Sequence, residues 1–377
     1  MSRGLMLSHL RNTRYLHGGY VYRETIKRML MLNDPALAMD EIAVHDQHHR
    51  GWRLCRQVVD VLTSPFSAYP AKVNHFRTRA FRQRMAATFA RTDYRLVVIS
   101  GADMLWCLDV IPARVPILYI SHNIEHLLYH QQVGKYAGVP GLGRLLRADA
   151  AKFKAFELSR LQRLRHIITI ADPDRQALQA CCPEARIVTI MPSFAYAPHA
   201  KRRRAEGAPL RLGFLGNLEW WPNRRSLQWF LDQVLPRVTA PGEVHLFGQG
   251  SDRFGDGGRV HGHGFVEDLA QVFGQVDLMI QPITCGGGVN IKVAEALYNR
   301  MPVLATPLAM RGLALSADPA IRVLAAAEEW IEYLNGPHPL AQAASAVRQE
   351  NAELFSLKRN ALALKGLVAA ARGEVGR

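Results

Sequence analysis

The sequence predicts an α/β protein of two domains, each a doubly wound parallel β-sheet flanked by helices. Its 377 residues exceed what one hydrophobic core usually spans, so two domains are expected. Short apolar runs alternate with helical stretches along both halves, a pattern typical of strands buried in parallel sheets. A charged, proline-containing segment without apolar periodicity, residues 194–209, separates the two halves.

The expected strands are short apolar runs bounded by turn residues. Those of the first half are residues 5–10, 41–45, 96–100, 117–121, 167–170 and 187–191. Those of the second half are residues 210–215, 244–247, 278–281, 303–306 and 321–324. Between them, apolar residues at helical spacing predict a helix over Leu227, Phe230, Leu231, Val234 and Leu235. We expect Asn223 to cap this helix and Pro236 to lie near its end.

The domain boundaries follow from these segments. We expect one domain over residues 1–193, a linker over 194–209 and a second domain over 210–351. Residues 352–377 are expected to form a C-terminal helix that crosses back to the first domain. Residues 51–91 are helical but irregular, and their arginines and aromatics fit an ordinary amphipathic helix or an acceptor or membrane surface.

The composition is that of a folded protein with anionic partners. Apolar residues make up 49% and charged residues 21%, and the net charge is +15. Such a charge favours phosphorylated substrates or an anionic membrane surface, although solubility alone explains it equally well. No nucleic-acid-binding motif is present, so nucleic acid is not expected as a partner.

The expected compartment is the cytoplasm, with peripheral attachment to the inner face of the cell membrane as an option. There is no apolar run of transmembrane length, and the N-terminal apolar stretch is too short for a secretory signal. The five cysteines show no CxxC pair or zinc spacing, which indicates reduced thiols.

The most informative segment is residues 285–313, where consecutive glycines run into a helix. The residues of interest are Gly286, Gly287, Gly288, Val289, Asn290, Lys292 and Glu295. Glycines permit close backbone approach, and a helix N-terminus offers free N–H groups to an anion. A phosphate would be held by these amides and Lys292, while Glu295 could accept hydrogen bonds from a vicinal diol. The simpler alternative is a glycine turn before a helix with a surface Lys–Glu pair.

Further candidates lie where other strands end. His17, Gly18 and Gly19 follow the first strand, and His122 directly follows the strand 117–121. His122 could hydrogen-bond a ligand, or it could be a silent capping residue. The pair His261 and His263 could bind zinc, but neither this pair nor His48 and His49 shows a reliable metal spacing, so no metal is expected.

The order of these segments resembles the GT-B nucleotide-sugar glycosyltransferases, in particular the retaining enzymes of glycosyltransferase family four. The resemblance runs from LRLGFLGNLEWWPNRR through VDLMIQP to GVNIKVAEALYNRMPVLATPLAMRGL and continues more weakly into the first half. It implies two Rossmann-like domains facing a central cleft, with the sugar donor bound by the second domain.

The resemblance also implies roles for particular residues. Glu295 resembles the glutamate that holds the donor ribose, and His122 the histidine near the transferred sugar. The loop that meets the nucleobase, mainly through its backbone, corresponds to Gly264, Phe265 and Val266. The turn near the diphosphate corresponds to Gly216 and Asn217.

Two departures from the family pattern stand out. The family often has a second glutamate eight positions before the ribose glutamate, and here that position is Gly287. Sugar contacts must then come from backbone amides or other side chains, which leaves the donor sugar and the stereochemical outcome open. The arginine and lysine that often follow the GFLG-type turn are replaced by NLEWWPNRR, so Lys292 is the preferred diphosphate partner.

The resulting hypothesis is a metal-independent, hexosyltransferase-type enzyme without a cofactor other than its nucleotide-sugar donor. It would transfer the sugar to a glycan or lipid-linked acceptor, with retention, in cell-surface polysaccharide or glycoconjugate biosynthesis. His122, Lys292 and Glu295 are the expected catalytic residues. The alternatives are a GT-B-type nucleotide-sugar epimerase and a non-catalytic nucleotide-sugar-binding subunit, which Gly287 favours.

Overall fold

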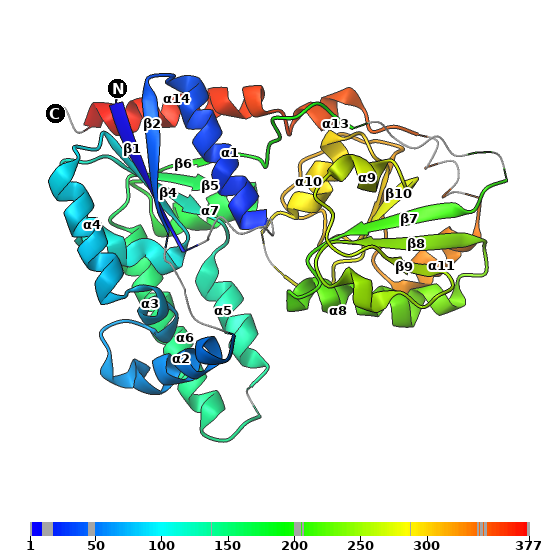
Figure 1. Cartoon of the computed structure of the whole chain (residues 1–377), viewed down its shortest axis with the longest axis horizontal. Helices are drawn as coiled ribbons and strands as arrows, with labels where there is room; N and C mark the ends of the chain where they lie inside the picture. The colour runs from blue at the N-terminus through cyan, green and yellow to red at the C-terminus, as the bar shows by residue number, and fades with distance from the viewer. Residues whose placement is uncertain are drawn as a thin grey trace. The chain divides into compact units, whose positions relative to one another are not determined.

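The computed structural model describes residues 2–9, 18–43, 50–136, 138–199, 205, 207–286, 288–337, 339, 342 and 345–374. It divides into two compact units. The first contains Met1–Ile190 and Ala361–Arg377, and the second contains Met191–Asn360. Each unit has its own six-stranded sheet (Figure 1), as expected for two doubly wound domains.

The sheet of the first unit is entirely parallel, with the strand order β2-β1-β3-β4-β5-β6. Its strands are β1 (Ser2–Ser8), β2 (Leu37–Ala43), β3 (Leu96–Ser100), β4 (Ile117–Ser121), β5 (His166–Thr169) and β6 (Arg186–Thr189). Each was predicted, with β1 and β2 displaced toward the N-terminus by a few residues. All residues of β3 and β5 are buried, and burial on both faces explains the continuous apolar run Leu96–Ile99 of β3.

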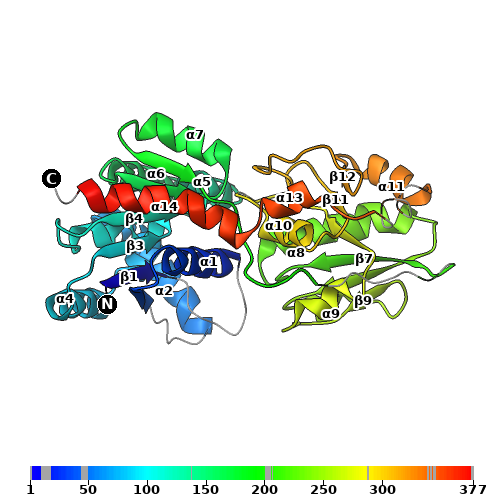
Figure 2. The same cartoon turned by 90° about the horizontal axis from the view of Figure 1, so that it is seen from above.

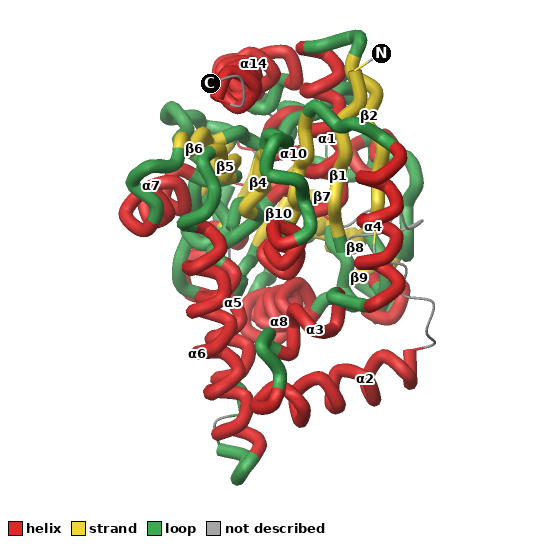
Figure 3. Tube along the Cα trace, turned by 90° about the vertical axis from the view of Figure 1, so that its left-hand side faces the viewer, coloured by secondary structure: helices red, strands yellow, loops and turns green. Residues whose placement is uncertain are grey.

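The helices of the first unit include some that flank the sheet and others, such as α2 (Arg50–Thr63), that pack on neighbouring helices. They are α1 (Gly18–Asn33), α2, α3 (Ala71–Phe76), α4 (Arg79–Arg91), α5 (Glu125–Gly134), α6 (Leu142–Leu161), α7 (Asp172–Cys181) and α14 (Leu357–Glu374), with 3₁₀ turns over Ser64–Phe66 and Ala102–Asp109. Helices α5 and α6 run side by side (Figure 3). The irregular region 51–91 consists of α2, α3 and α4. Pro70 precedes α3, and the Thr78 hydroxyl caps α4 by accepting from the Phe81 amide.

The C-terminal region is two helices rather than one. α13 (Gln349–Glu353) belongs to the second unit, whereas α14 from Ala361 onward belongs to the first, where it lies next to α1 (Figure 2). The two helices are separated by a non-helical segment that contains Phe355. Phe355 is fully buried there, and its carbonyl accepts from the Phe194 amide. Asn360 stabilises this segment by donating to the Ser193 hydroxyl and to the Leu354 carbonyl. Two hydrogen bonds hold α14 on the first unit. Asn33 Nδ2 donates to the Ala361 carbonyl, and the Arg372 guanidinium donates to the Asp34 carboxylate.

The sheet of the second unit is also parallel, with the order β12-β11-β10-β7-β8-β9. Its strands are β7 (Leu210–Leu215), β8 (Gly242–Phe247), β9 (Val260–Gly262), β10 (Leu278–Gln281), β11 (Val303–Ala305) and β12 (Ile321–Val323). Only β9 was not predicted, because it is three residues long and contains a glycine.

Two apolar layers enclose this sheet. One layer contains α8 (Trp221–Trp229) and α11 (Ala327–Asn335), and the other contains α9 (Leu269–Phe273) and α10 (Ile291–Tyr298). Leu278 and Ile280 of β10 face the first layer, and Met279 faces the second.

The helix predicted around residues 227–235 has a different cap from the one expected. It begins at Trp221, continues after Trp229 as a π turn over Phe230–Val234 and ends in a 3₁₀ turn over Leu235–Arg237. Asn223 therefore lies inside the helix and Trp220 is the N-cap. The capping prediction was wrong because Pro222 can occupy the first helical turn, which moves the start toward the N-terminus.

Candidate functional site

Glycine turns follow three neighbouring strands of the second sheet. Gly216 follows β7, Gly248 follows β8 and Gly264 lies just beyond β9. The Gly216 amide donates to the Phe247 carbonyl over 2.8 Å, and the Gly248 amide donates to the Gly264 carbonyl over 2.7 Å. Gly248 has a φ of 114°, and a Cβ there would clash with the Gly216 carbonyl. The carboxyl ends of these strands are thus held together as a compact backbone edge, where ligands of such sheets bind.

Asn217 organises the first of these turns. Its side-chain oxygen accepts from the Glu219 amide over 2.9 Å, and its carbonyl accepts from Asn223 Nδ2 over 2.8 Å. Asn223 in turn accepts at Oδ1 from Lys292 Nζ over 3.1 Å. The predicted diphosphate turn and the predicted diphosphate lysine are therefore joined through one side chain of α8.

The N-terminus of α10 has the features expected of an anion site. Asn290 is the N-cap, and its Oδ1 accepts from the Lys292 amide over 3.2 Å. Gly286 and Gly288 have φ values of 128° and 70°, which only glycine adopts readily. Val289 is buried and anchors the loop, while Gly287 lies outside the described residues. Asn290 accepts from the amides of the first turn, so the helix dipole and the amides of the preceding loop are what favour a negative ligand here.

Lys292 and Glu295 are half-buried groups on the first turns of α10. Burial lowers the pKa of Lys292 to about 8, although the Glu295 carboxylate acts in the opposite direction. Burial raises the pKa of Glu295 to about 7, against the effects of a Tyr196 hydrogen bond and of Lys292. Both groups are therefore poised near neutral pH, which is frequent at functional sites.

Tyr196 is a site residue that the sequence did not reveal. Its hydroxyl donates to Glu295 Oε1 over 2.9 Å, and Asn299 Nδ2 donates to the same hydroxyl over 3.2 Å. The Tyr196 carbonyl accepts from the Tyr298 hydroxyl. Tyr196 lies in the segment predicted as a linker, and only its aromatic character in an otherwise charged stretch could have singled it out.

Gln281 is a second such residue, at the carboxyl end of β10. Its side chain is fully buried, and Oε1 accepts from Asn290 Nδ2 over 3.3 Å. Its Nε2 has no hydrogen-bond partner within the described part of the chain. Gln281 could have been recognised as a candidate from the sequence, because it is a polar residue at the end of an otherwise apolar strand.

The predicted nucleobase loop lies beyond β9. Gly264 has a φ of 72°, and its amide donates to the Ser251 hydroxyl over 2.9 Å. Phe265 is 38% exposed, and Val266 packs against the apolar layer that contains α9 and α10. The loop thus combines a fixed backbone with an accessible aromatic ring.

In the first unit, His122 lies directly after β4 with a fixed ring. Its Nε2 is 2.8 Å from the Ser100 hydroxyl, and Tyr22 contacts the ring edge-on at 5.9 Å. Its Nδ1 is buried without a hydrogen-bond partner among the residues that the structure describes. Burial lowers the pKa of His122 to about 4, so the imidazole is neutral at pH 7.

A buried ionic cluster lies beside His122, and most of it was not predicted. Lys72 of α3 is 2.7 Å from Glu125 Oε2 and 3.4 Å from Asp103 Oδ1, and His9 is 3.9 Å from Asp103. Burial raises the pKa of Asp103 to about 6, although Lys72 opposes the shift. His9 and Asp103 follow β1 and β3, so their places after predicted strands could have marked them as candidate site residues. No feature of the sequence singles out Lys72.

Glu125 is the first residue of α5 and belongs to this cluster. Asn123 Nδ2 donates to its Oε1 over 3.2 Å. Burial acts to raise its pKa, yet the Lys72 ammonium holds the pKa below the usual value. This pairing indicates a structural role for Glu125 rather than that of a general base.

Gly18 and Gly19 begin α1, shortly after β1. They lie in the first unit, whereas the other predicted donor residues belong to the second. His17, like His48 and His49, lies outside the described residues.

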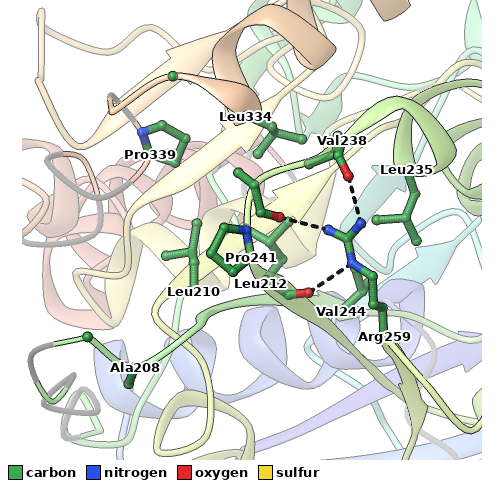
Figure 4. A pocket seen from close by; sticks show the side chains of 14 residues that line it. Ala208, Leu210, Leu212, Leu235, Val238, Pro241, Val244, Arg259, Leu334 and Pro339 are labelled. Carbon is green, nitrogen blue, oxygen red and sulfur yellow. Dashed lines mark hydrogen bonds between the residues drawn. The ribbon is translucent and has the colours of Figure 1, made fainter.

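A cavity of about 120 Å³ in the second unit lies apart from all of these residues (Figure 4). It is lined mainly by apolar side chains at the amino ends of β7 and β8, including Leu210 and Val244. Arg259 borders it, but its guanidinium already donates to the Val238, Ala240 and Gly242 carbonyls. The cavity is at the wrong end of the sheet for a ligand of the glycine turns.

Comparison with known proteins links the second unit to one family. Residues 209–336 match the family model described as Glycosyl transferases group 1, and this match spans about a third of the chain. The comparison with curated proteins gave no match.

The whole chain is similar in fold to solved glycosyltransferases. Sucrose-phosphate synthase from Thermosynechococcus elongatus superposes with a TM-score of 0.67 at 14% identity, covering 98% of this chain and 99% of that one. Anabaena Alr3699/HepE in complex with UDP and glucose superposes with a TM-score of 0.63 at 13% sequence identity, covering 98% of this chain and 100% of that one. WaaG, a glycosyltransferase involved in lipopolysaccharide biosynthesis, superposes with a TM-score of 0.61 at 14% sequence identity, covering 96% of this chain and 98% of that one. The GT-B fold is thereby confirmed, and the family match supports a glycosyltransferase of the group 1 type.

Proposed function

We propose that this protein transfers a sugar from a nucleoside-diphosphate sugar to a hydroxyl of a glycan or lipid-linked acceptor, with retention of configuration. One observation carries the proposal. Lys292 and Glu295 lie one turn apart at the N-terminus of α10, directly after glycines with positive φ. This arrangement offers a cation and the amides of the glycine loop to phosphates, and a carboxylate to a diol.

The donor would be divided between these groups. The amides from Gly286 to Asn290 and the Lys292 ammonium would bind the diphosphate and stabilise the charge that grows as it departs. Tyr196 donates to one oxygen of Glu295 and so orients the carboxylate that would accept from the ribose hydroxyls. The loop of Gly264, Phe265 and Val266 would meet the nucleobase. We propose that Lys292 and the amides make a metal ion unnecessary for the diphosphate.

The transfer itself requires no covalent bond to the protein. The acceptor oxygen forms a bond to the anomeric carbon as the bond from that carbon to the diphosphate oxygen breaks. The acceptor proton passes to the departing phosphate oxygen on the same face. The neutral His122 can donate or accept one hydrogen bond, which suits a sugar hydroxyl.

The substrate classes are suggested by solved relatives and by charge. HepE was solved with UDP and glucose, so UDP-sugars are the first donors to test. WaaG and the WaaB galactosyltransferase act in lipopolysaccharide synthesis, which supports a cell-surface glycan as the acceptor. No helix in the described residues is long and apolar enough to cross a bilayer. A net charge of +15 favours cytoplasmic action at an anionic membrane surface.

The second candidate is a non-catalytic nucleotide-sugar-binding subunit. Gly287 supports it, because this position lacks the carboxylate that the resemblance leads one to expect near the sugar.

Product analysis separates the candidates. A radiolabelled donor is incubated with the protein, with and without lipid-linked oligosaccharide extract. A labelled glycan formed only with extract supports the transferase. An epimerised sugar without extract indicates an epimerase, and bound but unconverted donor indicates the non-catalytic subunit.

A further inference from the structure

We propose that Glu243, His245 and His261 form a binding site for a divalent transition-metal ion such as Zn²⁺. Glu243 and His245 lie on β8, and His261 lies on β9. The two strands are hydrogen-bonded neighbours (Figure 1), and their register places His245 opposite His261. Because side chains two residues apart share one face of a strand, all three project from the same side of the sheet.

The spacing of the three side chains fits a metal ion after small rotations. One ligand atom from each lies within 4.8 Å of the other two. His245 Nε2 is 3.1 Å from Glu243 Oε2, and the rings of His245 and His261 stack at 4.9 Å. Tetrahedral zinc with bonds of about 2.0–2.1 Å requires ligand atoms roughly 3.3 Å apart.

Neighbouring groups already orient these ligands. His245 Nδ1 is 2.9 Å from His263 Nε2, and the ring of His263 stacks on Phe247 at 4.5 Å. Arg211 Nε donates to Glu243 Oε2 over 2.9 Å. Metal-binding histidines and carboxylates usually have such second hydrogen-bonding partners, which fix their orientation and tautomer.

One atom distinguishes a metal site from a simple hydrogen-bonded chain. Without an ion, His263 could donate to His245 and His245 to Glu243, so these groups are satisfied. His261 Nε2, however, is buried and has no hydrogen-bond partner in any described residue. A buried nitrogen without a partner costs stability, and a metal bond would satisfy it.

The chemistry of the ligands selects the class of ion. Two imidazoles and one carboxylate suit Zn²⁺, Co²⁺ or Ni²⁺, whereas Mg²⁺ and Ca²⁺ prefer oxygen ligands. On binding, His245 Nε2 gives up its proton to solvent, the proton that His263 Nε2 donates moves to His245 Nδ1, and His263 takes up one proton from solvent at Nδ1, so both imidazoles stay neutral and Nδ1–H of His245 donates to His263 Nε2. The Glu243 side chain is 28% exposed and that of His245 8%, so an ion can enter from the Glu243 side.

The position of the site suggests its purpose. β9 is a three-residue strand at the edge of the sheet, and it leads directly into the loop of Gly264, Phe265 and Val266. An ion shared by β8 and β9 would hold this loop in place. The effect on the loop rests on the proposed function, because the loop is the proposed nucleobase contact, but the ion site does not.

The test is a titration of the chelator-treated full-length protein with Co²⁺ and Zn²⁺. We expect one ion per chain, the visible absorption of tetrahedrally coordinated Co²⁺ and a higher melting temperature with Zn²⁺. His261→Gln should abolish the absorption, and His263→Gln should weaken binding by about 10–100-fold. Glu243→Gln is a second ligand variant in case His261→Gln does not fold.

Two control variants address other histidines. His130→Gln changes an exposed histidine of α5, and the double variant His48→Gln/His49→Gln changes the histidine-rich segment of the sequence. Both should bind like the unaltered protein. Absence of stoichiometric binding, or binding that survives His261→Gln and Glu243→Gln but not the double variant, would overturn the proposal. Donor calorimetry on the zinc-free protein tests the proposed function separately.

Discussion

Lys292 and Glu295 are the residues whose ionisation governs the proposed donor site. With pKa values of about 8 and 7, Lys292 loses its charge as pH rises through 8, and Glu295 loses its charge as pH falls through 7. Donor affinity in the free protein should therefore be highest between these values and fall on both sides. Calorimetry from pH 5.5 to 9.5 checks this. Lys292→Met should remove the alkaline fall, and Glu295→Gln the acid fall.

Tyr196 should act on the donor through Glu295. Its hydrogen bond lowers the pKa of Glu295, so Tyr196→Phe should move the acid fall in donor affinity to higher pH. Loss of a hydrogen bond to a charged group costs about 1.5–3 kcal/mol, so affinity should drop roughly tenfold or more. Tyr333→Phe, which removes a hydroxyl that donates to Gln342, is the matched control. An unshifted pH profile in Tyr196→Phe would show that the tyrosine does not orient the carboxylate.

At the scale of elements, the glycine turns hold the carboxyl ends of β7, β8 and β9 close together. Gly248→Ala should lower the free energy of unfolding by about 3 kcal/mol or more, because the φ of 114° is strained for alanine and the new Cβ meets the Gly216 carbonyl. Gly257→Ala, with a φ of 71° but open space, should cost only about 1 kcal/mol. Urea unfolding measures both. Equal losses would mean that close packing at Gly248 contributes nothing.

The elements also show what the sequence could predict. Fully buried strands such as β3 and β10 are unmistakable apolar runs, whereas β9 is too short and too glycine-rich to recognise. The helix α10 and its glycines were predicted because all of their signals are local. Tyr196, Lys72 and Asp103 join their sites from other parts of the chain, and contacts between distant residues leave no pattern in one sequence.

At the scale of the whole molecule, the C-terminus completes the first unit. Leu364 and Leu367 of α14 are fully buried, and Arg372 binds Asp34 over 2.9 Å. Truncation after Asn360 should destabilise the first unit by several kcal/mol, at about 1.5–3 kcal/mol per exposed leucine. Thermal unfolding should then show an earlier transition, while truncation after Arg372 should have little effect. Unchanged melting after the longer deletion would contradict the assignment of α14 to this unit.

The central claim is that the N-terminus of α10 binds a nucleoside-diphosphate sugar. Calorimetric titration with UDP-, GDP- and dTDP-sugars, with and without magnesium, tests it most directly. The matched variants are Glu295→Ala and Glu332→Ala, the latter changing an exposed glutamate of α11 in the same unit. We predict selective binding that is independent of magnesium, abolished by Glu295→Ala and unaffected by Glu332→Ala. Binding that Glu295→Ala leaves unchanged, or no binding of any donor, would contradict the claim.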